Sequence, residues 1–207
     1  MFTGIIIGTA KIAKIIKKDK FQEQIIKMPI EWVKELKTGD SVAQNGCCLT
    51  VTKINNDLVH FDVIEETLLK TNLGQLQQDS LINIELAAKV GDYIGGHLIS
   101  GHIIGTAIIT NVSKTGNNHK TTIKYPSHIG KYIFNKGYIS VDGISLTISD
   151  HNRAENTFCI NLIPETLKRT TISAKKTNDI VNIEIDSQTQ AIVETTEEVL
   201  KLRNTVK

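Results

Sequence analysis

The side chains of this sequence that could do chemistry are a thiol, a hydroxyl, an imidazole and a carboxylate. They are Cys48, Ser145, His102 and Asp186. A thiol with an ordinary pKa of about 8.5 becomes nucleophilic when a nearby cation favours the thiolate, and the other three groups can relay protons. The alternative for Cys48 is a buried, unreactive small side chain. These groups predict nucleophilic or acid–base catalysis, if the fold brings them together.

No metal site is expected. Cys47 and Cys48 are consecutive, so in a strand their side chains face opposite sides. His97 and His102 are five residues apart and fail the same test. Neither a CxxC nor an HExxH spacing occurs.

The elements that would position these groups come from an internal repeat. Residues 4–10 read GIIIGTA and residues 101–107 read GHIIGTA, with six of seven letters identical at a shift of 97. The same shift carries NGCCLTV at 45–51 onto DGISLTI at 142–148. Further along, a shift of 99 carries ETL and NIE of the first half onto the same letters of the second. Blocks that share nearly one offset indicate a duplicated domain of normal length.

We therefore expect two homologous domains, 1–97 and 98–189, and a tail, 190–207. In each domain, short β-rich stretches alternate with turn signals, which favours an antiparallel barrel or sandwich over βαβ units. The tail has apolar residues at three- and four-residue spacing, which predicts an amphipathic helix of about four turns. They are Ile192, Val199, Leu202 and Val206. This helix could pack on its own barrel or on other subunits.

Local signals refine this picture. Asn45-Gly46 and Asp142-Gly143 predict tight turns just before strands. Pro29 and Pro126 occupy equivalent positions, and each predicts a short helix opened by proline.

The repeat also shows which equivalent positions differ. The pairs are Cys48 and Ser145, Ile5 and His102, Asn45 and Asp142, and Ala87 and Asp186. Drift explains any one difference, but together they give one half a thiol and the other half a hydroxyl, an imidazole and a carboxylate. The divergence predicts that the two halves have different chemical tasks.

Composition excludes several classes of protein. The 207 residues are 40% apolar and 22% charged, as in a globular protein rather than a disordered or fibrous one. The net charge of +2 and the 5% content of aromatic residues argue against a nucleic-acid partner. Five lysines are expected on a solvated edge strand and loop; they are Lys11, Lys14, Lys17, Lys18 and Lys20. Three cysteines without a disulfide framework, no signal peptide and no long apolar run predict a cytoplasmic protein away from membranes.

Six motifs in the same order resemble the riboflavin synthase family, α-chain type. They are MFTGI, NGCCLTV, IGGHLISGH, DGISLTI, LIPETLKRTT and NIEID, and they extend over the whole chain. The resemblance implies an all-β fold of two six-stranded Greek-key barrels and a C-terminal helix, assembled as a homotrimer. It implies a transferase without metal or cofactor that dismutates two molecules of 6,7-dimethyl-8-ribityllumazine. One molecule gives four carbons to the other, which yields riboflavin and 5-amino-6-ribitylamino-pyrimidinedione.

The resemblance also implies substrate contacts, in a site between the first barrel of one subunit and the second barrel of a neighbour. The first half-site is expected to contain Gly4, Ile5, Ile6, Cys48, Leu49, Thr50, Asp62, Val63, Ile64, Glu65, Glu66 and Thr67. The second is expected to contain Gly101, His102, Ile103, Ser145, Leu146, Thr147, Asn161, Leu162, Ile163, Pro164, Glu165 and Thr166. Lys136 is expected to come from the adjoining subunit.

The chemistry assigns hypothetical roles to four of these groups. A base must remove an acidic proton from the C7 methyl group of one lumazine, and a nucleophile must add at C7 of the other. We assign Cys48 to the addition step or to polarising its proton. His102 and Ser145 would relay protons at the other ring, and Asp186 would orient or charge that relay. The roles of Cys48 and Ser145 could be exchanged.

The alternative function is a non-catalytic lumazine- or flavin-binding protein on the same fold. Such relatives lose the catalytic residues in the regions of NGCCLTV and GGHLISGH, and both regions are intact here. An oligonucleotide-binding barrel would need a basic groove with stacking aromatic residues. A purely structural trimer gives no reason for the differences between the halves.

Overall fold

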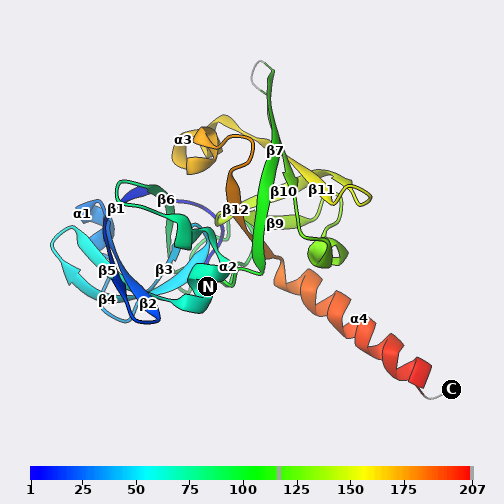
Figure 1. Ribbon diagram of the computed structural model, residues 1–207, viewed down its shortest axis with the longest axis horizontal. Helices are drawn as coiled ribbons and strands as arrows, with labels where there is room; N and C mark the ends of the chain where they lie inside the picture. The colour runs from blue at the N-terminus through cyan, green and yellow to red at the C-terminus, as the bar shows by residue number, and fades with distance from the viewer. Residues whose placement is uncertain (116–117, 206–207) are drawn as a thin grey trace.

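Strands dominate the chain and close into two separate barrels. A computed structural model describes residues 1–115 and 118–205 (Figure 1). The first barrel has the strand order β1-β2-β5-β4-β3-β6, and the second has the order β10-β11-β8-β7-β12-β9. All the pairings are antiparallel. The prediction of two six-stranded antiparallel barrels is confirmed.

Each barrel carries the same succession of elements. Barrel 1 contains β1 (Gly8–Lys18), β2 (Phe21–Lys27), α1 (Ile30–Val33), β3 (Ser41–Gln44), β4 (Cys47–Asn55), β5 (Leu58–Ile64), α2 (Glu65–Lys70), η1 (Asn72–Gln75) and β6 (Leu81–Leu86). Barrel 2 contains β7 (Gly105–Thr115), β8 (Asn118–Lys124), η2 (Ser127–Tyr132), β9 (Tyr138–Val141), β10 (Ile144–Asn152), β11 (Thr157–Leu162), α3 (Pro164–Arg169), η3 (Thr171–Ala174) and β12 (Ile180–Ile185). Then α4 (Ser187–Thr205) follows.

Alternating burial along the strands separates the barrel interior from the surface. In β5, Val59, Phe61 and Val63 are fully buried, whereas Asp62 and Ile64 are exposed. This period of two places every second side chain inside, as a half-buried strand requires. β1 pairs with β2 as far as Lys18, but it pairs with β6 only from Gly8 to Lys11. Lys14, Lys17 and Lys18 therefore lie where the described part of β1 has one free side, and Lys20 lies in the turn that follows, in agreement with the expected solvated edge strand and loop.

The two predicted tight turns are confirmed and lie against each other. Asn45 and Gly46 have φ values of 45° and 80°, and Asp142 and Gly143 have values of 47° and 82°. Positive φ at both central residues is the geometry that favours Asn-Gly and Asp-Gly. A Cβ atom on Gly46 would lie 2.6 Å from the Gly143 nitrogen, so the backbones meet too closely for a side chain.

The helices follow the local signals, and α4 begins slightly earlier than expected. Pro29 and Pro126 stand at the N-caps of α1 and η2, as predicted. The backbone N–H and the hydroxyl of Thr189 both donate to Asp186 Oδ2, at 2.9 and 2.7 Å, so Asp186 caps α4. This cap starts the helix at Ser187.

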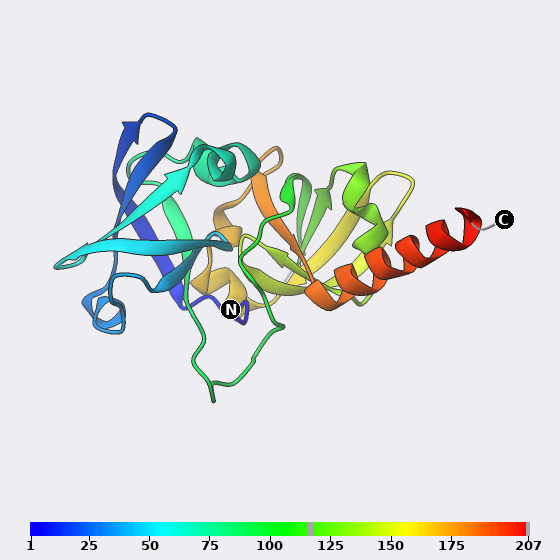
Figure 2. The same ribbon diagram turned by 90° about the horizontal axis from the view of Figure 1, so that it is seen from below.

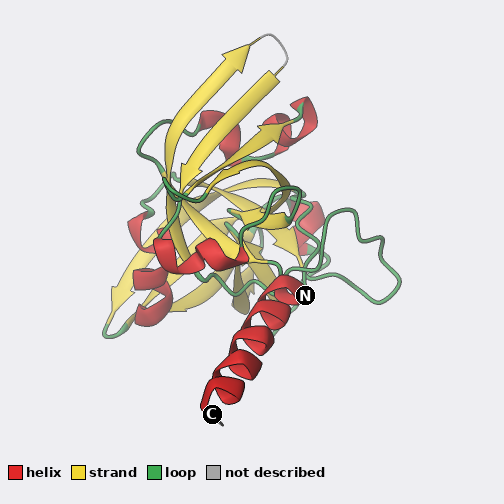
Figure 3. Cartoon of the chain, turned by 90° about the vertical axis from the view of Figure 1, so that its right-hand side faces the viewer, coloured by secondary structure: helices red, strands yellow, loops and turns green. Residues whose placement is uncertain are grey.

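α4 projects away from barrel 2 in all three views (Figures 1, 2 and 3). Of its predicted apolar stripe, Ile192 is 68% exposed and Leu202 is 59% exposed. Val206 lies outside the described residues. The described residues of the stripe therefore stay largely exposed, whereas Val193 of the same helix packs against the core of barrel 2. None of the described helices combines the length and the hydropathy that a bilayer span requires.

A buried polar network joins the barrels around the two tight turns. The Asn182 amide donates to the Asn45 carbonyl at 2.9 Å, and the Asn83 amide donates to the Asp142 carbonyl at 2.9 Å. The Asn72 backbone N–H donates to Asn182 Oδ1 at 2.7 Å. Because each barrel supplies an equivalent asparagine to the other, the network fixes how the barrels sit together.

Substitution of Asn182 by alanine is expected to lower the free energy of unfolding by about 2–4 kcal/mol. Three side-chain hydrogen bonds to Asn45 and Asn72 would be lost, and buried partners would remain unpaired. Urea unfolding followed by circular dichroism measures the change. The exposed Asn55→Ala variant is the control; equal stability of the two variants would contradict the role of the network.

Candidate active site

Two short segments cross from one barrel to the other and shape both candidate half-sites. The Ser145 backbone N–H donates to the Gly4 carbonyl at 2.9 Å, and the Cys48 N–H donates to the Gly101 carbonyl at 2.9 Å. Ile6 belongs to the core of barrel 2, and Ile103 packs against the core of barrel 1. The segment 4–6 precedes barrel 1 in the sequence but packs on barrel 2. The segment 101–103 precedes barrel 2 in the sequence but packs on barrel 1.

This crossing corrects the grouping expected from the sequence. Gly4, Ile5 and Ile6 lie with the Ser145 half-site, and Gly101, His102 and Ile103 lie with the Cys48 half-site. A Cβ atom on Gly4 would be 2.5 Å from Ser145 Cβ, and one on Gly101 would be 2.4 Å from Cys48 Cβ. Such close crossings, at φ values of 76° and 85°, require glycine.

Two buried glutamates hold the crossing segments. Glu85 accepts hydrogen bonds from Thr3 N–H at 2.6 Å and from Gly4 N–H at 3.0 Å. Glu184 accepts from Ser100 N–H at 2.7 Å and from Gly101 N–H at 3.1 Å. Burial raises the pKa of both carboxyl groups, and these donors oppose the rise. The sequence reasoning found these glutamates only as part of the repeated NIE letters and gave them no role.

The Ser145 half-site is an open cleft of about 340 Å³ in barrel 2. It is lined by Lys136, Ser145, Leu146, Thr147, Ser149, Asn161, Ile163 and Thr166. Six of the residues expected from the sequence thus lie together with Lys136, which is supplied by the same chain. Whether Lys136 also contributes to the site of an adjoining subunit stays a prediction, because it depends on how subunits assemble around this cleft. All these lining residues belong to barrel 2, so barrel 1 of the same chain leaves the cleft uncovered.

Lys136 occupies an unusual backbone position. Its φ is +66°, and the equivalent position in barrel 1 is Gly39, with a φ of +95°. A left-handed conformation is unfavourable for a residue with a side chain, and such strain gathers at functional sites. Barrel 2 therefore carries a cation where barrel 1 carries no side chain.

Ser145 has a histidine partner that the sequence reasoning set aside. The Ser145 hydroxyl lies 2.7 Å from Nδ1 of His97, and the His97 ring stacks on Tyr138 with centroids 5.0 Å apart. Burial lowers the pKa of His97, and the negative charge of Asp186 opposes this shift. A neutral imidazole beside a hydroxyl can accept a proton. The sequence pointed to His102, the second histidine of GGHLISGH. The pairing of His97 with Ser145 could not be predicted in this way, because it depends on the fold.

His102 and Asp186 do not form the expected relay with Ser145. The side chain of His102 is exposed, and its backbone N–H donates to Ser100 Oγ at 3.2 Å. His102 directly follows Gly101, which lies against Cys48. Asp186 caps α4 and acts on His97 through its charge. The structure thus places His97, rather than His102, beside Ser145, whereas His102 is next to Gly101, whose carbonyl accepts a hydrogen bond from the Cys48 N–H.

In the strands of the Cys48 half-site, exposed side chains alternate with side chains buried in the core of barrel 1. Cys48 is partly exposed, and Thr50, Asp62 and Ile64 are exposed. Burial raises the pKa of Cys47 to about 12, so its thiol stays protonated and unreactive. Cys48 is the better nucleophile candidate because it is more accessible.

Several residues that were expected to contact the substrate have side chains buried in a barrel core, so only their main chain is available. Others belong to the short helices α2 and α3 beside the half-sites. Four side chains point into the barrel cores: Leu49, Val63, Leu146 and Leu162. Glu66 pairs with Lys70 at 2.6 Å, and Glu165 pairs with Arg169. Pro164 is the first residue of α3, and Glu65 and Thr67 belong to α2. Glu65 lines a different cleft, described below.

Comparison with known proteins gives a consistent result. The lumazine binding domain family model matches residues 3–87 and 100–186. Riboflavin synthase of Escherichia coli (strain K12) is 50% identical over 98% of this chain and 95% of its own length. The riboflavin synthase of Buchnera aphidicola subsp. Schizaphis graminum is 48% identical over 97% of this chain and 96% of its own.

Solved structures resemble the fold as well. The crystal structure of LumP complexed with 6,7-dimethyl-8-(1'-D-ribityl) lumazine has a TM-score of 0.81 at 27% identity, and the similarity covers 89% of this chain and 99% of that chain. LumP complexed with riboflavin has a TM-score of 0.83 at 28% identity, with the same coverage.

Proposed function

This chain belongs to the riboflavin synthase family, and from that premise we propose how its two half-sites divide the reaction. The enzyme is of the riboflavin synthase type and acts on two molecules of 6,7-dimethyl-8-ribityllumazine. The observation that carries the proposal is a duplicated half-site with different chemistry in each copy. One copy offers Cys48, and the other offers Ser145 with His97 at 2.7 Å.

At the barrel 2 half-site, neutral His97 accepts the proton of the C7 methyl group, directly or through the Ser145 hydroxyl. Lys136 stabilises negative charge that develops on that ring. At the barrel 1 half-site, Cys48 adds at C7 of the second lumazine or polarises a water that does so, with His102 nearby. Correct placement of two large rings contributes about 7–11 kcal/mol, and a placed proton acceptor contributes about 100- to 10,000-fold.

We propose that each complete site forms between barrel 1 of one subunit and barrel 2 of another, in a homotrimer. The barrel 2 cleft is lined by its own barrel alone, which leaves room for a facing half-site. The apolar Ile64 and Ile163, at equivalent positions beside the two half-sites, are 56% and 64% exposed. A bound ring or a neighbouring subunit would cover them. We also place the enzyme in the cytoplasm, because all three cysteines are free.

Incubation of the purified protein with 6,7-dimethyl-8-ribityllumazine tests the function. We expect riboflavin and the ribitylamino-pyrimidinedione in equal amounts, followed by absorbance and chromatography. Binding of the lumazine without any conversion would favour the alternative, a non-catalytic binding protein. The intact Cys48, Ser145 and His97 favour catalysis.

Replacement of Lys136 by glycine is expected to reduce riboflavin formation at least tenfold without loss of stability. Glycine adopts the positive φ of this position freely, so the free energy of unfolding should stay within about 1 kcal/mol of the native value. Lys136→Ala keeps the strain and should be less stable than Lys136→Gly by about 1 kcal/mol. Thermal unfolding and turnover assays measure both effects; full activity of Lys136→Gly would remove the cation from the proposal.

Deletion of residues 187–207 is expected to convert the trimer to smaller species. The apolar stripe of α4 is exposed on the single chain, and trimer contacts would bury it. Light scattering after size-exclusion chromatography gives the mass. An unchanged trimer would show that the barrels, rather than α4, hold the subunits together.

A further inference from the structure

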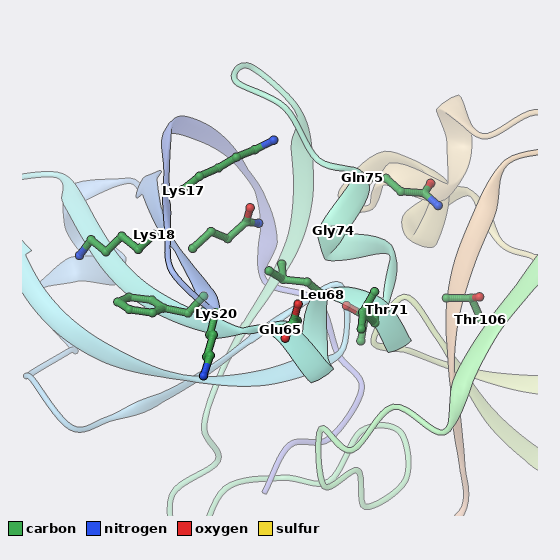
Figure 4. Close-up of a pocket in the computed structure, with 12 residues that line it drawn as sticks. Lys17, Lys18, Lys20, Glu65, Leu68, Thr71, Gly74, Gln75 and Thr106 are labelled. Carbon is green, nitrogen blue, oxygen red and sulfur yellow. The ribbon is translucent and has the colours of Figure 1, made fainter.

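A cleft separate from the Ser145 half-site opens on barrel 1. It has a volume of about 480 Å³ and lies between the β1–β2 hairpin, α2 and η1, and it reaches Thr106 on β7 of barrel 2 (Figure 4). A second hollow of about 520 Å³ adjoins it and shares Lys17, Gln22, Gly74 and Gln75. Volumes of this size suit small organic ligands. Among the described residues that line the cleft, Glu65 alone was expected at the active site.

Gln22 gives this cleft a buried hydrogen-bond donor. Its side chain lines both hollows and is 7% exposed. In the described part of the chain, its Nε2 has no hydrogen-bond partner. A buried amide without a partner is costly, so the position favours a ligand that brings an acceptor oxygen.

The charge of the cleft selects an anion. Lys17, Lys18 and Lys20 line the cleft, but their side chains point in different directions (Figure 4). Lys18 pairs with Glu23 at 3.0 Å and lies over the Phe21 ring, 5.0 Å from its centroid, which leaves Lys17 and Lys20 as the free cations of the described lining. Glu65 is the one carboxylate among the described lining residues. The cleft is therefore positively charged overall and attracts an anionic group.

Apolar side chains complete the cleft walls. Leu68 and Leu69 line it, and Leu69 is 80% exposed; Phe21 also lines it, with Lys18 Nζ over its ring. Such surfaces pack against a flat ring. We propose that this cleft is a second ligand site, which binds an organic phosphate monoester with a flat heteroaromatic ring, its phosphate toward Lys17 and Gln22, which lie opposite each other on β1 and β2 and line both hollows.

Flavin mononucleotide is the appropriate probe, because it differs from riboflavin only by the phosphate. The half-sites are first filled with excess riboflavin, and bound flavin mononucleotide is then counted by equilibrium dialysis and chromatography. We expect about one molecule of flavin mononucleotide to bind each chain under these conditions, more weakly at high salt. Loss of all flavin mononucleotide binding when riboflavin fills the half-sites would overturn the proposal.

Matched variants separate the rim charges from the buried amide. Both the Lys17→Gln/Lys20→Gln double variant and Gln22→Leu should weaken flavin mononucleotide binding at least fivefold, with riboflavin formation unchanged. The controls are the equivalent positions of barrel 2, as Lys114→Gln and His119→Leu; His119 is likewise buried with unpartnered ring nitrogens. The controls should bind normally. If the lysine variant loses affinity and Gln22→Leu does not, binding is a surface charge effect and the proposed site is wrong.

Discussion

Replacement of His97 by glutamine is expected to slow riboflavin formation about a hundredfold or more. The imidazole Nδ1 lies 2.7 Å from the Ser145 hydroxyl, and glutamine cannot accept a proton there. Ser145→Ala should cause a comparable loss, and the double variant should be scarcely worse than either, because the two groups act as a unit. Single-turnover rates at saturating lumazine measure this. Additive losses would contradict a shared proton path.

The pH dependence of the rate gives a second test of His97. Because burial lowers its pKa, the neutral imidazole should persist below the ordinary histidine value of about 6.5. The rate should therefore fall only below that pH. Asp186→Asn preserves a good N-cap for α4 and removes the charge that raises the pKa of His97. The acid limb of this variant should move to lower pH; an unmoved limb would separate Asp186 from His97.

Trimers mixed from Cys48→Ala chains and Ser145→Ala chains are expected to recover about one third of the native activity, although each variant alone loses at least a hundredfold. In the proposed cyclic trimer, barrel 1 of each chain would face barrel 2 of the next. Every mixed trimer then contains one site that joins an intact Cys48 to an intact Ser145. Co-expression with two affinity tags and sequential purification yields the mixed species for assay.

The controls for this experiment are the trimers of each variant alone, purified in the same way. Their inactivity shows that neither tag nor purification restores function. Mixed trimers that are as inactive as the controls would show that both half-sites of one active site belong to a single chain. That result would overturn the inter-subunit arrangement and leave the riboflavin synthase activity itself untouched.

The sequence by itself determined the architecture. The offset of 97 predicts two copies, and the alternating strands and the Asn45-Gly46 and Asp142-Gly143 turns predict antiparallel barrels. These signals are local: side-chain period and turn conformation depend on neighbouring residues. The equivalence of Cys48 and Ser145, which carries the functional argument, also follows from alignment of the halves.

The composition of each half-site was decided only by the tertiary structure. Gly4 packs on Ser145 and Gly101 packs on Cys48, contacts that span long stretches of sequence and leave no periodic pattern. The same crossing brings His97 rather than His102 to Ser145. A repeat shows which residues are equivalent, but it cannot show which copy's segment lies on which barrel. That choice depends on how the two folded barrels pack against each other.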